Sequence, residues 1–292
     1  MTLPLLLRER LAGLLGAPVE HVRPEYGGDI NQAARLEVKG TPYFVKWHHS
    51  APPQMFSAEA HGLLLLAEAG AIRVPTVIAW DEAGDGCPAF LLLEYIETGG
   101  RATSQTMERF GTALAELHRH TAPHFGLDRD NFIGRLPQPN TPCQSWATFY
   151  AEQRLGFQME LARRNGRLPA RREKLLTRLI ERLPDLLGDD AIAPALIHGD
   201  LWGGNYLVDA QGQAVLIDPA VCYAHREMDL AMSELFGGYS SRFYEAYFEA
   251  YPAPGYPERR ALYQLYYILA HLNLFGESYG GRVDAIAAHY VG

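Results

Sequence analysis

One stretch in the last third of the chain constrains its fold more than any other. It begins with the apolar pair Leu196-Ile197 and continues as His198-Gly199-Asp200-Leu201-Trp202-Gly203-Gly204-Asn205. A second apolar run, Ala214–Ile217, leads into Asp218, thirteen residues after Asn205. Short apolar runs separated by a Gly-Gly turn predict buried strands joined by a loop. We therefore expect these polar residues to gather at strand ends.

The polar residues of this stretch read H-x-D-x-x-x-x-N followed by a second aspartate, the spacing of a phosphoryl-transfer centre of the protein-kinase kind. In such a centre one carboxylate accepts the proton of the attacking hydroxyl, the role predicted for Asp200. Asn205 and Asp218 are predicted to hold Mg²⁺, which prefers hard oxygen ligands. His198 is interpreted as a hydrogen-bonded core residue. Asp229 is interpreted as an anion near the N-terminus of a helix or as a residue that holds the loop of His198.

The composition is compatible with such an enzyme and argues against other classes. Hydrophobic residues make up 48% and charged residues 21% of 292 residues, ordinary for a globular protein. The net charge of −8 argues against a general nucleic-acid binder. Cys87, Cys143 and Cys222 have no paired spacing and are predicted to be free thiols. Since no run approaches the ~20 apolar residues of a membrane helix, we expect a cytoplasmic protein.

Residues 1–97 predict a small lobe built on an antiparallel sheet. Its leucines recur at helical spacing near the start, and polar and apolar residues then alternate as they do in a β-hairpin. The elements expected are a helix at 2–16, hairpin strands at 35–38 and 43–47, a helix at about 55–69, and strands at 74–80 and 90–96.

Lys46 lies inside the second hairpin strand, and the glycine turn of Gly27 and Gly28 ends eighteen residues before it. In a kinase-like lobe such a lysine contacts the nucleotide phosphates and pairs with a glutamate of the following helix. Glu59 is the leading candidate and Glu68 the poorer one. Each residue also has a plain interpretation, as a solvent-facing lysine, a helix-surface glutamate or a simple turn. The glycine loop lacks a full G-x-G-x-x-G.

A lobe boundary is predicted at Thr98-Gly99-Gly100, so that residues 98–292 form a second, mainly helical lobe. The strand that ends there can offer main-chain groups to an adenine edge, and we place the base near Glu94, Tyr95 and Ile96. The predicted fold class is α+β with two lobes of the protein-kinase-like kind. The helices expected in the second lobe begin near residues 104, 145, 171, 228, 240, 257 and 283.

Two basic features of the second lobe have ordinary interpretations. His118 and His120 end the first helix, where cations suit the helix dipole. The arginines between Arg163 and Arg172 are interpreted as a solvated helix face. Recruitment of an anionic substrate is the alternative for that cluster.

Two departures from protein kinases are informative. His198-Gly199-Asp200 replaces the His-Arg-Asp form, so the arginine that senses a phosphate on the activation loop is absent. Asp218-Pro219 replaces Asp-Phe-Gly, and Ala220–Arg226 leads almost at once into the next helix. There is no room for a long activation segment. This pattern predicts a small-molecule kinase that needs no such activation.

Several segments together resemble the fructosamine kinase family, the ketosamine 3-kinases. Three features separate this family from aminoglycoside and choline kinases: Trp202 inside the catalytic loop, the Pro-Gln-Pro-Asn loop and the Leu-Phe-Gly-Gly-Tyr segment. The resembling segments cover nearly the whole chain: Val45-Lys46, Met55–Glu59, Ile133–Asn140, Leu196–Asn205, Ile217–Ala220, Met232–Tyr239 and Tyr263–Gly276.

The resemblance implies ATP-dependent phosphorylation of the 3-hydroxyl of a ketoamine, a sugar attached to an amine by glycation. The phosphorylated adduct would then release the free amine, an activity that deglycates and repairs proteins. By family position Asp200 is the base, Asn205 and Asp218 hold Mg²⁺, and Lys46 with Glu59 sets the phosphates of ATP.

The resemblance also implies a substrate site. Trp202 would form a stacking wall for the sugar, and His271 and Asn273 would line the same pocket. Some relatives carry a cysteine in the glycine turn that is linked to redox-sensitive dimers. This chain has Asp29 at about that position, which argues against thiol control of that loop. We expect a monomer or a weak homodimer.

Two other functions remain open at this stage. The first is a kinase of another small alcohol, such as an aminoglycoside, homoserine or choline, which would share the central motif. The second is a nucleotide-binding module without catalysis, which would bind ATP but not turn it over. A substrate panel with ADP as readout separates the three.

Overall fold

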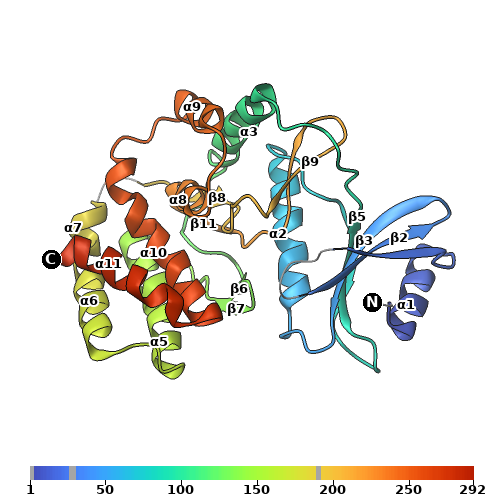
Figure 1. The fold of residues 1–292 in the computed structure, drawn as a ribbon, viewed down its shortest axis with the longest axis horizontal. Helices are drawn as coiled ribbons and strands as arrows, with labels where there is room; N and C mark the ends of the chain where they lie inside the picture. The colour runs from blue at the N-terminus through green and yellow to red at the C-terminus, as the bar shows by residue number, and fades with distance from the viewer. Residues whose placement is uncertain (1–2, 26–30, 189–191) are drawn as a thin grey trace. The chain divides into compact units, whose positions relative to one another are not determined.

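The structure is a computed structural model and describes residues 3–25, 31–188 and 192–292. The chain divides into two compact units (Figure 1). The first comprises Met1–Ala102 with Leu207–Asp218, and the second Thr103–Tyr206 with Pro219–Gly292. The sequence placed a single boundary between residues 97 and 98, whereas the structure also returns the segment 207–218 to the first unit.

Hydrogen bonds explain why the segment 207–218 belongs to the first unit. The backbone N–H of Leu216 donates to Arg73 O at 3.0 Å, and that of Ala210 donates to Glu97 O at 2.8 Å. The Arg73 guanidinium donates to the buried Asp209 carboxylate at 2.6 Å. Because these partners are far apart in the sequence, local patterns did not reveal them.

The first unit is built on a five-stranded antiparallel sheet in the order β1-β2-β3-β5-β4. The predicted hairpin is confirmed, and so is the helix at 55–69. The strand β1 was missed, and β4 begins three residues later than expected. The elements are α1 (Leu5–Leu15), β1 (His21–Glu25), β2 (Gln32–Val38), β3 (Thr41–His48), α2 (Met55–Ala69), β4 (Val77–Asp81) and β5 (Ala89–Glu94), with β9 (Tyr206–Val208) and β10 (Ala214–Leu216) pairing in a second, two-stranded sheet.

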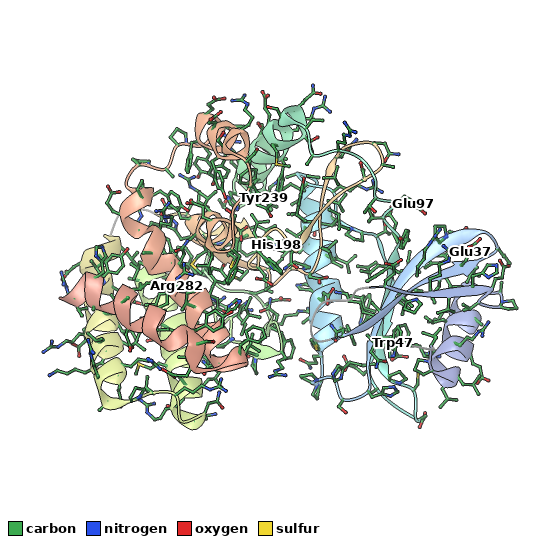
Figure 2. The ribbon with its side chains drawn as sticks, in the orientation of Figure 1. Glu37, Trp47, Glu97, His198, Tyr239 and Arg282 are labelled. Atoms are coloured by element: carbon green, nitrogen blue, oxygen red, sulfur yellow. The ribbon has the colours of Figure 1, made fainter. Side chains whose placement is uncertain are left out.

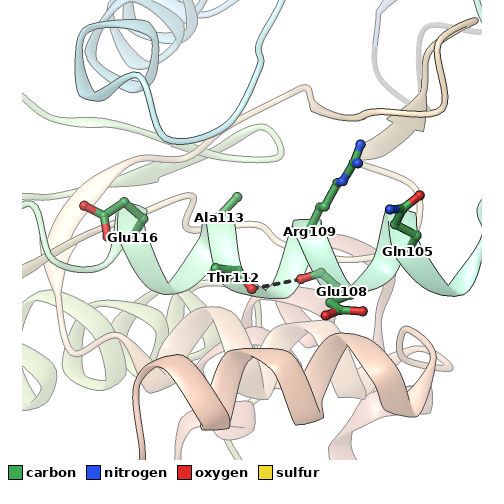
Figure 3. A pocket seen from close by; sticks show the side chains of 6 residues that line it. All are labelled: Gln105, Glu108, Arg109, Thr112, Ala113 and Glu116. Carbon is green, nitrogen blue, oxygen red and sulfur yellow. Dashed lines mark hydrogen bonds between the residues drawn. The ribbon is translucent and has the colours of Figure 1, made fainter.

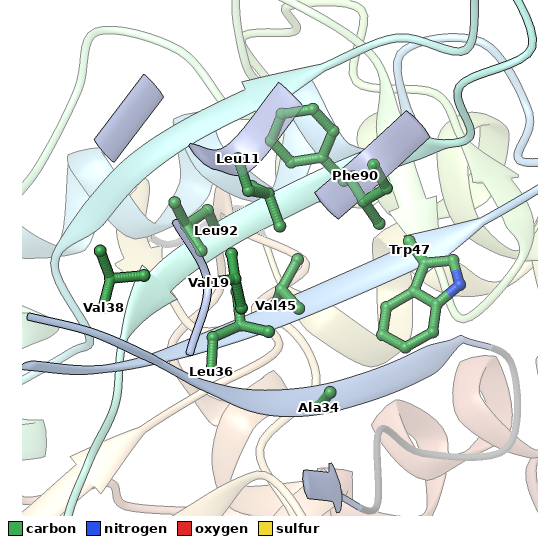
Figure 4. Close-up of a cluster of buried hydrophobic side chains, with 10 residues drawn as sticks. Leu11, Val19, Ala34, Leu36, Val38, Val45, Trp47, Phe90 and Leu92 are labelled. Atoms are coloured by element: carbon green, nitrogen blue, oxygen red, sulfur yellow. The ribbon is translucent and has the colours of Figure 1, made fainter. Parts of the chain in front are cut away.

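One face of the five-stranded sheet packs against α1 to form the core of this unit (Figure 4). Val45 and Trp47 of β3 both point into this core. Since side chains alternate across a strand, Lys46 between them points to the opposite face. The alternation that identified the strand therefore also fixes the side on which Lys46 lies.

The second unit is mainly helical and carries two short antiparallel strand pairs, β6 with β7 and β8 with β11. Residues 150–156 adopt a π-helix, which the sequence did not indicate. The elements are α3 (Ser104–Leu117), β6 (Asn131–Ile133), β7 (Leu136–Gln138), α4 (Trp146–Phe149), η1 (Tyr150–Gly156), α5 (Phe157–Arg164), α6 (Ala170–Glu181), α7 (Leu183–Leu187), β8 (Ala195–Ile197), β11 (Cys222–Ala224), α8 (Glu227–Leu235), α9 (Ser241–Ala250), α10 (Tyr256–Phe275), η2 (Glu277–Tyr279) and α11 (Gly280–Val291).

All helices expected in the second unit are present, because their apolar residues recur at helical spacing. The three cysteines are free, as predicted. Across the described residues, no helix has the length and apolar character that crossing a membrane requires.

Candidate active site

The buried Lys46 lies at the centre of an ion cluster in the first unit. Its Nζ donates to Glu59 Oε1 and to Asp218 Oδ1, both at 2.5 Å, and Lys46 is only 2% exposed. Burial alone would lower the pKa of Lys46, but the carboxylates of Asp218 and Glu59 outweigh it and raise that pKa above its ordinary value. The lysine is therefore a fixed cation, as a ligand for phosphate oxygens requires.

The cluster contains the pair that the sequence predicted, and it adds a carboxylate. Glu59 projects from α2, and Asp218 follows β10. Asp218 has a backbone φ of 54°, in the left-handed region that non-glycine residues adopt at a cost of order 1 kcal/mol. The segment that returns to the first unit thus brings a predicted metal ligand to the strand lysine.

The main chain at the end of β5 was predicted to bind the adenine. The Glu94 N–H already donates to Thr76 O at 2.8 Å, so it is not a candidate contact. The Glu94 carboxylate accepts from the Arg73 guanidinium at 2.7 Å, and it also accepts from the Thr76 hydroxyl at 3.0 Å. The side chain of Glu94 is thus engaged within the protein. Gly27 and Gly28, predicted to cover the phosphates, lie outside the described residues.

Asp200 and Asn205 form one hydrogen-bonded loop in the second unit. The Asn205 amide Nδ2 donates to Asp200 Oδ2 and to Asp200 O, both at 2.9 Å. The amide nitrogen therefore faces the Asp200 carboxylate, and the amide oxygen, the atom a metal would use, faces away from it. The loop holds a proton acceptor and an oxygen ligand in one defined arrangement.

A buried aspartate anchors this loop. Asp229 of α8 accepts from the backbone N–H of His198 at 2.7 Å and of Gly199 at 2.8 Å. His198 is fully buried (Figure 2), and its Nδ1 accepts from the Asp200 N–H at 3.3 Å. The structural roles predicted for His198 and Asp229 are both confirmed.

The interpretation of His118 as a cation at a helix end was wrong. His118 is fully buried, its Nε2 lies 3.2 Å from Asp229 Oδ2, and its Nδ1 lies 2.8 Å from the Tyr247 hydroxyl. Burial lowers the pKa of His118, although Asp229 opposes the shift. The neutral ring donates from Nε2 to Asp229 and accepts from Tyr247 at Nδ1. The sequence could not show an acidic partner 111 residues away.

His118 gives a prediction for stability against pH. The unfolded chain protonates His118 below about pH 6.5, whereas the folded protein, with a lowered pKa, resists protonation. The unfolded state then binds more protons, so the free energy of unfolding falls as pH falls from 7 to 5.5. The slope from one such group approaches about 1.4 kcal/mol per pH unit. Urea denaturation at several pH values measures it. A His118→Gln protein with an unchanged slope would contradict this assignment.

A polar network beneath the loop was missed by the sequence analysis. The Asn131 amide donates to Val221 O at 2.8 Å, and the Gln138 amide donates to Ala220 O at 3.2 Å. Tyr266 donates to Gln138 Oε1 at 2.5 Å. The Pro-Gln-Pro-Asn loop thus supports the segment after Asp218-Pro219. The signal in the sequence was the pair of amide residues beside prolines, Gln138 and Asn140. In the sequence this pair indicated only the family and not the hydrogen bonds.

The three predicted substrate residues occupy different environments. Trp202 is exposed and contacts Phe236 edge-on, with ring centroids 6.3 Å apart. His271 also contacts Phe236, with ring centroids 4.8 Å apart. Asn273 instead is buried, and its Nδ2 donates to Gln158 Oε1 at 2.9 Å. Asn273 therefore joins α10 to α5, and its place in the substrate pocket stays a prediction.

The arginines between Arg163 and Arg172 were interpreted as a solvated helix face, and this interpretation was wrong for Arg172. Arg163 pairs with Glu160 and, at 2.8 Å, with Glu173. Arg172 is buried and pairs with Glu277 at 2.6 Å. These carboxylates engage Arg163 and Arg172, which argues against the alternative of substrate recruitment for these two arginines.

A shallow depression on the exposed face of α3 contains none of the predicted site residues (Figure 3). Its lining belongs to this one helix, and the Thr112 hydroxyl within it donates to Glu108 O at 3.1 Å. We assign it no function. The lining residues are Gln105, Glu108, Arg109, Thr112, Ala113 and Glu116.

Comparison with known proteins agrees with the geometry. The chain matches the family described as fructosamine kinase over residues 9–291. It is 44% identical over 283 residues to a probable ketoamine kinase of Lactiplantibacillus plantarum, covering 96% of this chain and 98% of that protein. It is 40% identical over 268 residues to a chloroplastic protein-ribulosamine 3-kinase of Arabidopsis thaliana, covering 91% and 81% respectively.

A solved structure confirms the predicted fold. The crystal structure of a proposed fructosamine-3-kinase from Thermobifida fusca superposes with a TM-score of 0.87 at 37% identity. The match covers 97% of each chain. Because the family profile and these relatives span nearly the whole sequence, this chain belongs to the fructosamine kinase family.

Proposed function

We propose that this protein transfers the γ-phosphoryl group of ATP to the 3-hydroxyl of ketoamines, in support of protein deglycation. The observation that carries this proposal is the Asp200–Asn205 loop, fixed by the buried Asp229, in a chain of the fructosamine kinase family. The ion cluster of Lys46, described above, supplies the cation that a nucleotide phosphate needs.

Asp200 serves as the general base. The sugar 3-hydroxyl oxygen forms a bond to the γ-phosphorus while the bond from that phosphorus to the β,γ-bridging oxygen breaks. The hydroxyl proton passes to the Asp200 carboxylate, and ADP leaves with the electron pair. Since the transition state is loose, correct positioning of the hydroxyl contributes more than nucleophile strength. The bond from Asn205 holds the carboxylate for this role.

Asn205 and Asp218 would hold Mg²⁺. The donor set fits, because an amide oxygen and a carboxylate are hard ligands and Mg²⁺ keeps several waters and phosphate oxygens besides. When bound, the ion neutralises charge on the phosphates. Lys46, which now donates to Asp218, would also contact the phosphate oxygens, with Glu59 holding its position.

The remaining nucleotide contacts follow from the sequence. Gly27 and Gly28 would cover the phosphates with backbone N–H groups. The adenine ring of ATP would contact the main chain of Glu94, Tyr95 and Ile96. The Glu94 N–H is excluded, because it already donates to Thr76 O. A monomer or weak homodimer in the cytoplasm remains our prediction.

A direct assay tests the function. The protein is incubated with Mg-ATP and a ribulose- or fructose-lysine adduct, and NMR locates the new phosphate. We expect phosphate at the sugar 3-position and no product when EDTA removes the metal. Aminoglycosides, homoserine and choline serve as comparison substrates with ADP as readout. Transfer to one of these alcohols and to no ketoamine would refute the proposal, as would ATP binding without turnover of any substrate.

A further inference from the structure

The exposed aromatic residues of the second unit gather in one place. Its exposed large hydrophobic residues, among those the structure describes, are Trp202 (38%), Phe236 (39%) and Phe275 (55%). Isolated exposed apolar residues need no explanation, but a contiguous group of them marks a binding surface. We call the group of Trp202, Phe236, His271, Phe275 and Tyr279 the aromatic shelf.

Ring contacts join the members of the aromatic shelf. Phe236 contacts Trp202 and His271, as described above. His271 contacts Phe275 and Tyr279, with centroid distances of 5.4 and 5.2 Å. The shelf thus draws on the catalytic loop, the end of α8, the last turns of α10 and the following η2. Segments distant in the sequence place their rings side by side, which distinguishes the shelf from a chance exposed residue.

Trp202 connects the shelf to the reacting group. It follows Asp200 by two residues. A Cβ placed on Gly204 would lie 2.3 Å from atoms of the Trp202 indole, so the indole rests directly against that glycine. The absence of a side chain at Gly204 therefore permits the observed position of Trp202.

His271 adds a polar acceptor to the shelf. Its Nδ1 lies 2.8 Å from Tyr267 O in the same helix. Since a carbonyl oxygen only accepts, Nδ1 carries the hydrogen, and Nε2 is the acceptor of the neutral ring. Burial lowers the pKa of His271, which favours the neutral form. The shelf thus combines ring faces with an acceptor nitrogen.

We propose that the aromatic shelf binds the amine side of the ketoamine, meaning its protonated nitrogen and the hydrocarbon stem that carries it. This inference rests on the proposed function, with Asp200 as the base. In a ketoamine only C2 and C1 separate C3 from the nitrogen, so the amine must lie close to the base. Trp202, two residues after Asp200 in the catalytic loop, provides ring surface for this part of the substrate. Aromatic faces attract cations and pack against alkyl stems. The shelf therefore determines which amines the enzyme prefers as the group attached to the sugar.

Two substrates that share the sugar and differ only in the stem test this inference. They are the fructose adducts of methylamine and of hexylamine, both of which carry the same protonated nitrogen. We expect the unaltered protein to prefer the hexylamine adduct. Phe275→Ala should lower kcat/KM for that adduct about tenfold through KM. The methylamine adduct should change less than twofold. Trp80→Ala, at an exposed aromatic residue of β4, is the control and should change neither.

A second pair of variants guards against misfolding of Phe275→Ala. Gly204→Ala forces the Trp202 indole to move, whereas a Cβ on Gly203 would meet nothing within 4 Å. We expect Gly204→Ala to reduce the preference for the hexylamine adduct and Gly203→Ala to retain it. Equal loss on both adducts in Phe275→Ala, or an unchanged preference in Phe275→Ala and Gly204→Ala, would overturn the shelf assignment. If the unaltered protein phosphorylates no ketoamine, the proposed function itself fails.

Discussion

Replacement of Asp200 by asparagine is expected to lower kcat by about 10²- to 10⁴-fold, the contribution of a positioned general base. Asparagine has nearly the same shape, and its amide oxygen can still accept the hydrogen bond from Asn205. The loop should therefore keep its conformation while it loses the proton acceptor. Steady-state kinetics with Mg-ATP and a ketoamine measure kcat. Titration calorimetry should show a Kd for ATP within about twofold of the unaltered protein.

A matched variant separates this effect from a general change of charge. Asp128→Asn removes a carboxylate whose side chain is 61% exposed in the same unit, and we expect it to leave kcat unchanged. Retention of a tenth or more of the activity in Asp200→Asn would show that another group accepts the proton. A parallel loss of ATP affinity would instead place Asp200 in nucleotide binding.

Gly199→Ala should be the most disruptive small substitution in the catalytic loop. Gly199 has a φ of +83°, and a Cβ there would lie 2.0 Å from Ala220 O. The left-handed backbone costs an L-residue about 1–2 kcal/mol, and overpacking adds about 1–3 kcal/mol. We expect the free energy of unfolding to fall by more than 2 kcal/mol. We also expect kcat to fall, because Gly199 links the anchor Asp229 to Asp200. Urea denaturation and steady-state kinetics measure these effects.

Gly166→Ala is the control for Gly199→Ala, because it isolates the cost of backbone conformation. Gly166 has a φ of +67°, but a Cβ there would meet nothing within 4 Å. The free energy of unfolding of Gly166→Ala should fall only by about 1–2 kcal/mol, the cost of the left-handed conformation, and the protein should keep full activity. If Gly199→Ala is no less stable than Gly166→Ala, the close approach of Ala220 is not a constraint.

Gly199 also explains a departure that the sequence could only record. The motif has glycine where protein kinases have arginine. The structure shows that any side chain at this position would meet the Ala220 carbonyl. The substitution therefore reflects a close backbone approach as well as the loss of a phosphate sensor.

The sequence by itself determined the features that depend on local spacing. The alternation of polar and apolar residues predicted the β2–β3 hairpin and the face of the sheet on which Lys46 lies. The helical spacing of apolar residues predicted α2, which carries Glu59. The order of polar residues from His198 to Asn205 defined the catalytic loop, and segments along nearly the whole chain indicated the family. These features follow from neighbours a few residues apart, because strand and helix periods repeat over such distances.

Only the tertiary structure decided which distant groups meet. It returned the segment 207–218 to the first unit, paired His118 with Asp229, and gathered the aromatic shelf. It also joined the Asn273 amide to Gln158. Burial and contacts between residues from different elements depend on how whole elements pack. No local period in the sequence encodes that packing, which is why these contacts required the folded chain.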